Sequence, residues 1–115
     1  MDTEFPGIVA IPNQKTQYQA IKVNVDLLKI IQVGLCFLDS DGNLAPGTSC
    51  WQFNFRYSLG TDMHAQDSIE LLRQAGIPFD TLELKGIDRQ VFAEMFINSG
   101  LCLSKKVNWV TCLLY

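Results

Sequence analysis

Apolar and polar side chains follow two different periods along the chain. Between residues 17 and 31 the apolar positions recur every three or four residues, as in an amphipathic helix: Tyr18, Ile21, Val25 and Leu28. Residues 33–38 form a short apolar run that is typical of a buried strand. Residues 50–57 alternate as a strand does, placing Trp51, Phe53, Phe55 and Tyr57 on one face and Gln52, Asn54 and Arg56 on the other. The last two segments, joined by a loop containing Asp41-Gly42, are predicted to form a hairpin.

Two further helices are predicted in the second half of the chain. Asp67 followed by Glu70 fits a capping box, and Gly76 ends that helix. Asp88 caps the other helix, Ser99-Gly100 ends it, and its predicted core positions are Val91, Phe92, Met95 and Phe96. Residues 1–5 and 107–111 are predicted strands. The order of strand, helix, hairpin, two helices and strand predicts an α/β fold with one mixed sheet flanked by helices.

Length and composition limit the possible architectures. A chain of 115 residues suffices for one small domain, and 48% hydrophobic residues with 18% charged residues indicate an ordered protein. The net charge of -3 provides no overall positive field to hold phosphate backbones. A nucleic-acid partner would therefore need another attachment, such as divalent cations bound by carboxylates.

The cysteines, the start of the chain and the apolar runs indicate the cellular compartment in which the protein is expected. The four cysteines are Cys36, Cys50, Cys102 and Cys112. They are scattered along the chain and form no C-x-x-C pair, which predicts buried free thiols in a reducing compartment. The acidic start, broken by Pro6-Gly7, does not fit a secretory signal. No apolar run approaches the roughly 20 residues needed to span a bilayer. We expect an intracellular, soluble protein with no membrane partner.

The strand at the start of the chain carries the candidate chemistry. Asp2 and Glu4 are two positions apart, so in a strand both carboxylates project from the same face, about 7 Å apart. Two such carboxylates can share a pair of hard divalent cations. An Asp-x-Glu spacing is expected about 0.4 times by chance in a chain of this length, so a solvated strand end remains open as an alternative.

Other residues favour structural roles. His64 is the lone histidine and could be taken for a catalytic base, but a structural role is expected. Residues 39–43 resemble a calcium-binding loop with a misplaced glycine and no Glu at its twelfth position, so a hairpin turn is expected. The aromatic face of residues 51–57 fits a sheet core better than a base-stacking platform.

Four segments together resemble one family. MDTEFPG, NVDLLKIIQVGL, WQFNFRY and DMHAQDSIELL occur in the order and spacing of the Caf/Pop-type deadenylases, the nuclease subunit of the Ccr-Not complex. The resemblance runs from Met1 to Thr111. It implies an RNase D-like exonuclease of the DEDD class, with an RNase H-like fold, that uses Mg²⁺ or Mn²⁺ to remove adenosines from the 3′ end of messenger RNA.

The resemblance also implies residue roles and partners. Asp2 and Glu4 match the first Asp and the Glu of the class name, so both are expected to be catalytic metal ligands. The implied partners are the poly(A) RNA 3′ end and Ccr-Not subunits, namely the scaffold and a second deadenylase. The implied localisation is nucleus and cytoplasm. A partner-binding surface is expected on the outer side of the first helix, around Asn24, Asp26 and Leu27, with a solvated helix face as the alternative.

The chain departs from the family at both ends. Family members have a helix and most of the first strand before MDTEF, and after the strand at 107–111 they continue with FHSGYDF, two more catalytic aspartates and a histidine base. Here the residues after Thr111 are CLLY. We therefore expect residues 1–115 to be one partial ribonuclease domain, incomplete at both ends and inactive alone. The alternative is a non-catalytic fragment that binds partners and competes with the intact deadenylase.

Overall fold

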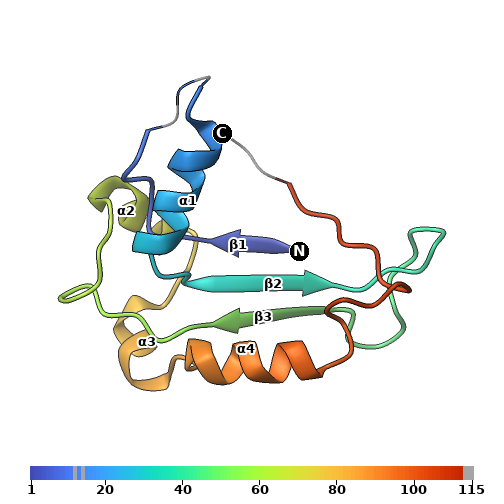
Figure 1. The fold of residues 1–115 in the computed structure, drawn as a ribbon. Helices are drawn as coiled ribbons and strands as arrows, with labels where there is room; N and C mark the ends of the chain where they lie inside the picture. Colours follow the sequence, from blue (N-terminus) through green and yellow to red (C-terminus); the bar gives the residue numbers. More distant parts are fainter. Residues whose placement is uncertain (12, 14, 113–115) are drawn as a thin grey trace.

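The computed structural model describes residues 1–11, 13 and 15–112. Strands and helices follow one another in an α/β arrangement, and the predicted α/β class is confirmed (Figure 1). Within the described residues, no helix is both long and apolar enough to cross a membrane. The elements are β1 (Asp2–Glu4), α1 (Gln17–Leu27), β2 (Gln32–Cys36), β3 (Cys50–Asn54), α2 (Gln66–Gln74), α3 (Phe79–Lys85) and α4 (Arg89–Asn98).

The sheet has three strands in the order β1-β2-β3, and each neighbouring pair is antiparallel. The predicted hairpin is confirmed as β2 and β3. Its loop is held by the Asp39 carboxylate, which accepts hydrogen bonds from the backbone of Asp41 and Asn43, both at 2.9 Å, as expected for a turn. Parallel pairing, which a mixed sheet requires, occurs among the described residues as an isolated bridge between Phe55 and Ile87.

Two predictions about elements were wrong. Residues 107–111 form no strand: Val110 accepts a hydrogen bond from the Met1 nitrogen at 2.8 Å, and the Trp109 ring packs edge-on against Phe96. Strand propensity depends on a neighbouring strand, whereas this segment makes a ring contact at Trp109 and backbone hydrogen bonds at Val107 and Val110. Helix α3 was not predicted, because seven residues following Pro78 are too few to show a helical period.

The helix caps were predicted with mixed success. The Asp88 side chain accepts hydrogen bonds from the backbone of Gln90 and Val91, which confirms the cap of α4. The capping box at Asp67 is wrong, because α2 begins at Gln66 and Asp67 lies inside its first turn. Gly76 and Gly100 follow α2 and α4 with positive φ angles of 97° and 82°, a conformation that glycine adopts at little cost, so both predicted helix ends are confirmed.

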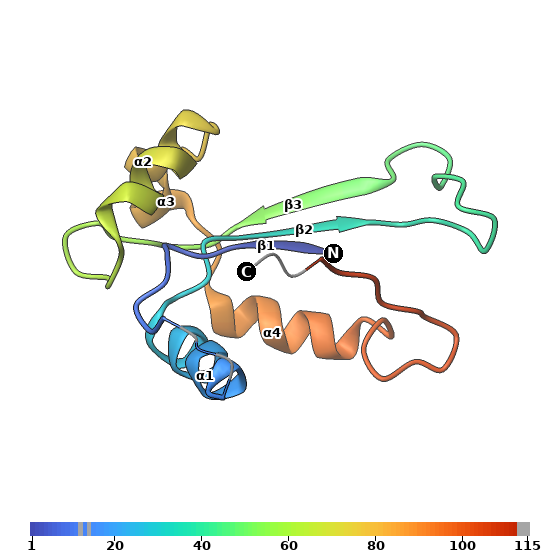
Figure 2. The ribbon, with the colours of Figure 1, turned by 90° about the horizontal axis from the view of Figure 1, so that it is seen from above.

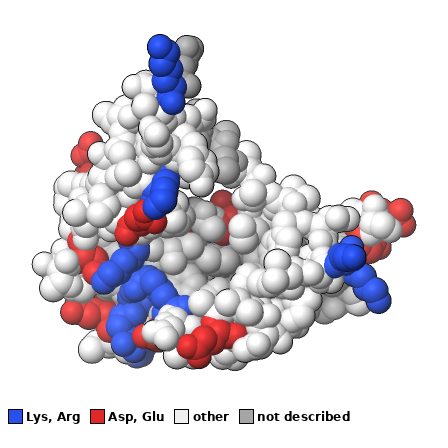
Figure 3. Space-filling model, viewed as in Figure 1, with Lys and Arg blue, Asp and Glu red and all other residues white. Residues whose placement is uncertain are grey.

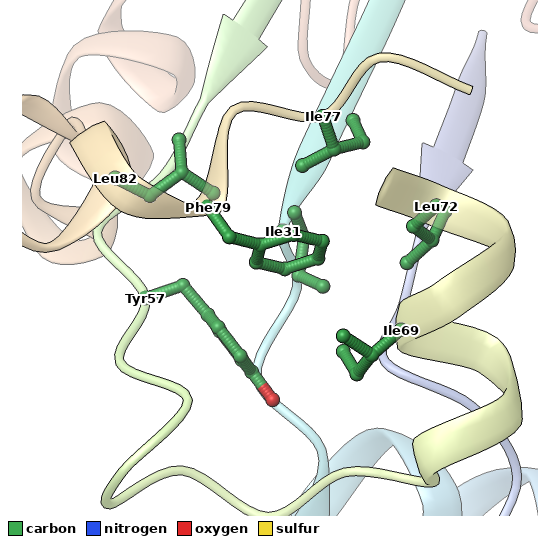
Figure 4. Close-up of a cluster of buried hydrophobic side chains, with 7 residues drawn as sticks. All are labelled: Ile31, Tyr57, Ile69, Leu72, Ile77, Phe79 and Leu82. Carbon is green, nitrogen blue, oxygen red and sulfur yellow. The ribbon is translucent and has the colours of Figure 1, made fainter. Parts of the chain in front are cut away.

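The core consists of two clusters, one at the end of the sheet where β2 begins and one between the sheet and α4. Helices α2 and α3 lie on one side at one end, whereas α1 and α4 lie on the other (Figure 2). The first cluster joins α2 and α3 to the sheet and comprises Ile31, Tyr57, Ile69, Leu72, Ile77, Phe79 and Leu82 (Figure 4). The second packs Val33, Leu35 and Phe55 against Phe92 and Phe96 of α4. Phe92 and Phe96 thus face the core as predicted, but Val91 and Met95 are exposed, contrary to prediction.

Helix α1 buries a different face from the one predicted. Leu28 is buried, but Tyr18 and Val25 are exposed. Asn24, predicted on the outer side, is only 7% exposed. Its side-chain oxygen accepts hydrogen bonds from the backbone of Val9 and Ala10, both at 2.8 Å, and its side-chain nitrogen donates to the Ala10 carbonyl. Asn24 therefore holds the preceding loop against the helix and is not part of an exposed surface.

The prediction of four free, buried thiols was wrong for Cys36 and Cys50, whereas Cys102 and Cys112 are free as predicted but not buried. Cys36 and Cys50 face each other in the hairpin register and form a disulfide. Cys102 and Cys112 are free, with Cys102 half-buried and Cys112 exposed. A scattered spacing in sequence did not show this pairing, because the hairpin brings together two cysteines that are 14 residues apart.

Candidate functional site

Strand β1 places the two predicted carboxylates on the edge of the sheet. It pairs with β2 so that Asp2 lies opposite Gly34 and Glu4 lies opposite Gln32. Because side chains two positions apart share a face of a strand, Asp2 and Glu4 project together. Both carboxylates and these two β2 residues line the same cavity. The structure therefore brings the two predicted site residues together.

The segment after β1 fixes the end of the strand. The Ile31 backbone donates to the Glu4 carbonyl at 2.8 Å, and the Ala65 backbone at the start of α2 donates to the Pro6 carbonyl at 2.9 Å. Gly7 has a φ of +123°, and a Cβ there would lie 2.6 Å from the Ala65 Cβ. The predicted halt at Pro6-Gly7 is thus a close contact with α2, which only glycine allows. These contacts fix the end of β1 that follows Glu4 against β2 and α2.

The cavity beside the carboxylates has a volume of about 470 Å³. It lies over the polar face of the sheet, and its lining residues outside β1 are Gln32, Gly34, Leu35, Cys36, Cys50, Trp51 and Gln52, together with Met1. A Cβ on Gly34 would have the Asp2 carbonyl oxygen as its nearest neighbour, at 4.0 Å. Because Gly34 has no side chain, the cavity has more room opposite Asp2.

The polar row on this face continues beyond the carboxylates. The Gln32 side chain donates a hydrogen bond of 2.7 Å to the Asn54 side-chain oxygen. The alternation of residues 52–56 predicts this polar face but not its neighbourhood with Asp2 and Glu4. Gln32 and Gly34 were missed because residues 33–38 were interpreted as a continuous apolar run. The usable signal was the alternation of Gln32, Gly34 and Cys36 with Val33 and Leu35.

The two carboxylates share an uncompensated negative charge. Burial raises the pKa of Glu4 above its usual 4.5, and the neighbouring charge of Asp2 raises it further. The ion pairs in the described part of the chain, Lys22 with Asp26 and Lys29 with Asp62, involve neither residue. On the face shown in Figure 3, several basic side chains gather at the lower left with acidic ones around them. A cation between the two carboxylates would relieve their repulsion.

The donor chemistry fits a hard divalent cation, but the number of donors is small. Carboxylate oxygens are preferred ligands of Mg²⁺ and Mn²⁺. One Asp2 oxygen already accepts a hydrogen bond of 2.9 Å from the Thr3 backbone. Among the described residues, no group of three or more His, Cys, Asp or Glu side chains is arranged to hold a metal. Asp2 and Glu4 thus bring two carboxylate groups to the cavity, fewer than such a group contains.

The remaining sequence candidates take structural roles in the described part of the chain. His64 Nδ1 donates to the Asp62 carbonyl at 2.9 Å, and His64 does not line the cavity beside Asp2 and Glu4. Phe55 and Tyr57 are buried in the core as predicted, whereas Trp51 at the other end of the aromatic face is 49% exposed.

The amino-acid sequence of this chain is similar to those of known proteins. No protein-family model matches the chain. The chain is 50% identical over 122 residues to the probable CCR4-associated factor 1 homolog 10 of Arabidopsis thaliana, covering 96% of this chain and 44% of the relative. It is 49% identical over 118 residues to the poly(A) ribonuclease pop2 of Schizosaccharomyces pombe, covering 96% of this chain and 35% of the relative. The chain is homologous to part of the CCR4-associated factor 1/Pop2 poly(A) ribonucleases. The resemblance predicted from the four sequence segments is thereby confirmed.

Solved structures of Pop2-type ribonucleases have the same fold. The S. pombe Pop2 structure in its Mg²⁺- and Mn²⁺-bound form matches with a TM-score of 0.86 and 46% identity, over 92% of this chain and 44% of that protein. Yeast CAF1 co-crystallised with the NOT1 MIF4G domain matches with a TM-score of 0.64 and 35% identity, over 86% and 37%. The chain thus spans less than half the length of the Pop2-type proteins that it matches.

Proposed function

We propose that this chain carries the Asp-x-Glu half of the active site of a poly(A)-specific 3′-to-5′ exoribonuclease. The observation that carries the proposal is the pair of Asp2 and Glu4, which line one cavity in a chain of which 92% matches a Pop2 structure. Their substrate would be the 3′ end of a poly(A) tail, the kind of RNA named for the S. pombe relative.

Asp2 and Glu4 would hold divalent metal, with Mg²⁺ or Mn²⁺ as the ion. The S. pombe Pop2 structure contains both ions. Burial, and then repulsion from Asp2, raise the pKa of Glu4, and a cation at this position would relieve that repulsion. When bound, such ions stabilise the charge that develops on phosphate oxygens during cleavage. The chain's own contribution is to aim both carboxylates into the cavity and to leave room beside them through Gly34.

A chimaeric enzyme tests this proposal. Residues 1–112 of this chain would replace the matching segment of S. pombe Pop2, so that the rest of the site comes from the relative. We expect shortening of an A-tailed RNA that depends on Mg²⁺ or Mn²⁺. Asp2→Asn and Glu4→Gln should each lower the rate by roughly 100-fold or more, because each removes a proposed metal ligand. The RNA lengths would be followed on denaturing gels.

Two controls make the result specific. Thr3→Val changes the residue between the two carboxylates, whose side chain projects from the other face, and should leave the rate within about threefold of the chimaera. The 115-residue chain alone should not shorten the RNA, because its described residues supply only two carboxylates to this site. Full activity of the Asp2→Asn chimaera would show that the pair is not part of the active site.

A second candidate function is partner binding within the Ccr-Not complex. The match to CAF1 solved with the NOT1 MIF4G domain supports it, because this chain would retain part of the ribonuclease that contacts the scaffold. The outer side of α1 presents exposed Leu27 and the exposed ion pair of Lys22 with Asp26. Such a chain would compete with the intact deadenylase for its partners.

Co-purification tests this second function. Lys22→Glu combined with Leu27→Ala should lower the amount of a NOT1 MIF4G domain that co-purifies with the chain, by about tenfold if these side chains are central to the contact. The matched control is Leu84→Ala with Lys85→Glu, which alters an exposed leucine and lysine of α3. If both double variants lose the same amount of co-purifying NOT1 MIF4G domain, or if neither loses any, the surface on α1 is excluded as the contact.

A further inference from the structure

The disulfide between Cys36 and Cys50 lies in the same cavity as Asp2 and Glu4. Cys36 is two residues beyond Gly34, the β2 partner of Asp2, and Cys50 is the β3 partner of Cys36. Alternate residues share one face of a sheet, so the two sulfurs continue the polar row that carries the carboxylates. Both cysteines line the cavity of about 470 Å³ beside Asp2.

Both cysteines are accessible in the folded chain. Cys36 and Cys50 are exposed at the far end of the β2–β3 ladder, outside both buried clusters. Thiol–disulfide exchange begins when a thiolate attacks one of the two sulfurs, so its rate depends on access to the bond. A small thiol in solution therefore reaches this disulfide without opening the core.

The hairpin holds the two cysteines together independently of their bond. Five residues of β2 pair with five of β3, ending with Cys36 opposite Cys50, and their Cα atoms are 4.1 Å apart. Just beyond this pair, the Phe37 backbone donates to the Ser49 carbonyl at 2.9 Å, and the Ala45 backbone donates to the Phe37 carbonyl at 3.1 Å. After reduction, this ladder would keep the thiols adjacent. Bond formation between two groups held in place is strongly favoured over reaction with a separate molecule.

We propose that Cys36 and Cys50 form a reversible thiol–disulfide site on the folded hairpin, with low-molecular-weight thiols of the glutathione class as reaction partners. The proposal does not depend on ribonuclease activity. It makes the wall of the cavity beside Asp2 and Glu4 a site of covalent modification.

The exchange proceeds in two balanced steps. The thiolate of one small thiol attacks a cysteine sulfur, a mixed disulfide forms, and the other cysteine leaves as a thiolate that takes up a proton. A second small thiolate then attacks the small thiol's sulfur in the mixed disulfide, forming the small-molecule disulfide and releasing the remaining cysteine, which is protonated. Two electrons pass from the two small thiols to the protein. The reverse steps oxidise the pair.

The mixed disulfide has a direct steric consequence. A tripeptide thiol joined to Cys36 or Cys50 would project from a wall of the cavity that Asp2 and Glu4 also line. The half-exchanged chain should therefore have a filled cavity, whereas the fully oxidised and fully reduced chains have an open one.

Thiol labelling of the purified 115-residue chain tests the proposal. The chain would be equilibrated in buffers of varied reduced-to-oxidised glutathione ratio, then alkylated and mapped by mass spectrometry. We expect two labels in oxidising buffer, on Cys102 and Cys112, and four in reducing buffer. The far-UV circular dichroism should stay unchanged across the transition, and amide exchange should rise only in residues 37–49. Reoxidation should restore two labels.

Matched cysteine variants identify the pair. Cys102→Ser with Cys112→Ser should keep the same transition, now from no labels to two. Cys36→Ser and Cys50→Ser should each abolish the paired change, because the remaining cysteine has no partner thiol and exchanges singly, as a mixed disulfide with glutathione. Four labels in every buffer, a bond from Cys36 or Cys50 to Cys102 or Cys112, or reduction only with loss of the circular dichroism signal would overturn the proposal.

Discussion

Glu4 is held in an environment that disfavours its charge. Partial burial is the larger cause of its raised pKa, and the nearby charge of Asp2 raises the pKa further. A carboxyl with a raised pKa in the folded state contributes stability that is fully present below its unfolded pKa of about 4.5. That contribution is lost as the pH rises through the folded pKa. At neutral pH the ionised Glu4 therefore opposes folding, as expected for a residue kept for a role other than stability.

Glu4→Gln should therefore stabilise the chain at neutral pH in metal-free buffer. Glutamine keeps the shape of the side chain and removes the charge, so the urea midpoint should rise at pH 7, and the gain should vanish below about pH 4. The matched control is Glu83→Gln, an exposed carboxylate on α3, with an effect within about 0.5 kcal/mol. An equal gain for both variants would mean that the surroundings of Glu4 do not disfavour its charge.

Asn24 shows why single residues were the least predictable feature. Its side chain has the polarity of a surface residue, although helical spacing places it one turn before Leu28, beside the apolar stripe. The structure buries it because the backbone of Val9 and Ala10 satisfies its oxygen and nitrogen. Those partners lie 14 and 15 residues away, in a loop whose path the sequence pattern does not determine. By contrast, Asp2 and Glu4 share a face because of strand geometry alone, so their arrangement was predictable.

At the scale of elements, the helix starts offer a direct test of capping. The sequence pattern predicts aspartate caps at both Asp67 and Asp88, but of these two only Asp88 accepts hydrogen bonds from the first turn of its helix. Asp88→Ala should lower the free energy of unfolding by about 1 kcal/mol, as for other N-cap residues. Asp67→Ala should cost about 0.5 kcal/mol or less, since Asp67 interacts only with the helix dipole. Urea unfolding measures both, and equal losses would contradict the assigned start of α2.

Elements with a strong local pattern were predicted, and those that depend on distant partners were not. The β2–β3 hairpin follows from alternation and an Asp-Gly turn, both of which are local. Helix α3 has only seven residues, and it is held by burying Phe79 and Leu82 against Tyr57 and Ile31. Residues 107–111 have the composition of a strand but pack by the Trp109 ring. Tertiary contacts decide both cases, and a single-sequence pattern does not contain them.

For the whole molecule, the candidate site was predictable in part. The carboxylates and the family followed from the sequence segments. The cavity did not, because it needs Gly34 opposite Asp2 and the Cys36–Cys50 pair beyond it. Strand register determines these neighbours, and register is set by pairing between segments far apart in the sequence.

A charged cluster joins three separate parts of the molecule. The Asp62 carboxylate pairs with Lys29, which precedes β2, and accepts a hydrogen bond of 2.9 Å from the Ser58 backbone. Arg89, at the start of α4, donates from Nε to the Ile30 carbonyl at 3.1 Å. Burial would raise the pKa of Asp62, but the Lys29 and Ser58 hydrogen bonds and the charges of Lys29 and Arg89 together lower it. The cluster thus connects α4 and the loop after β3 to the start of β2.

Asp62→Asn should therefore destabilise the chain as a whole. A carboxyl with a lowered pKa contributes stability that is present above its unfolded pKa and lost as the pH falls through the folded value. The urea midpoint of the variant should lie below that of the parent chain at pH 7, and the two should converge as the pH falls below about 4. Asp41→Asn, in the exposed hairpin loop, should match the parent at both pH values. A difference between Asp62→Asn and the parent that persists at low pH would mean that the shape of the side chain, and not its charge, holds the three parts together.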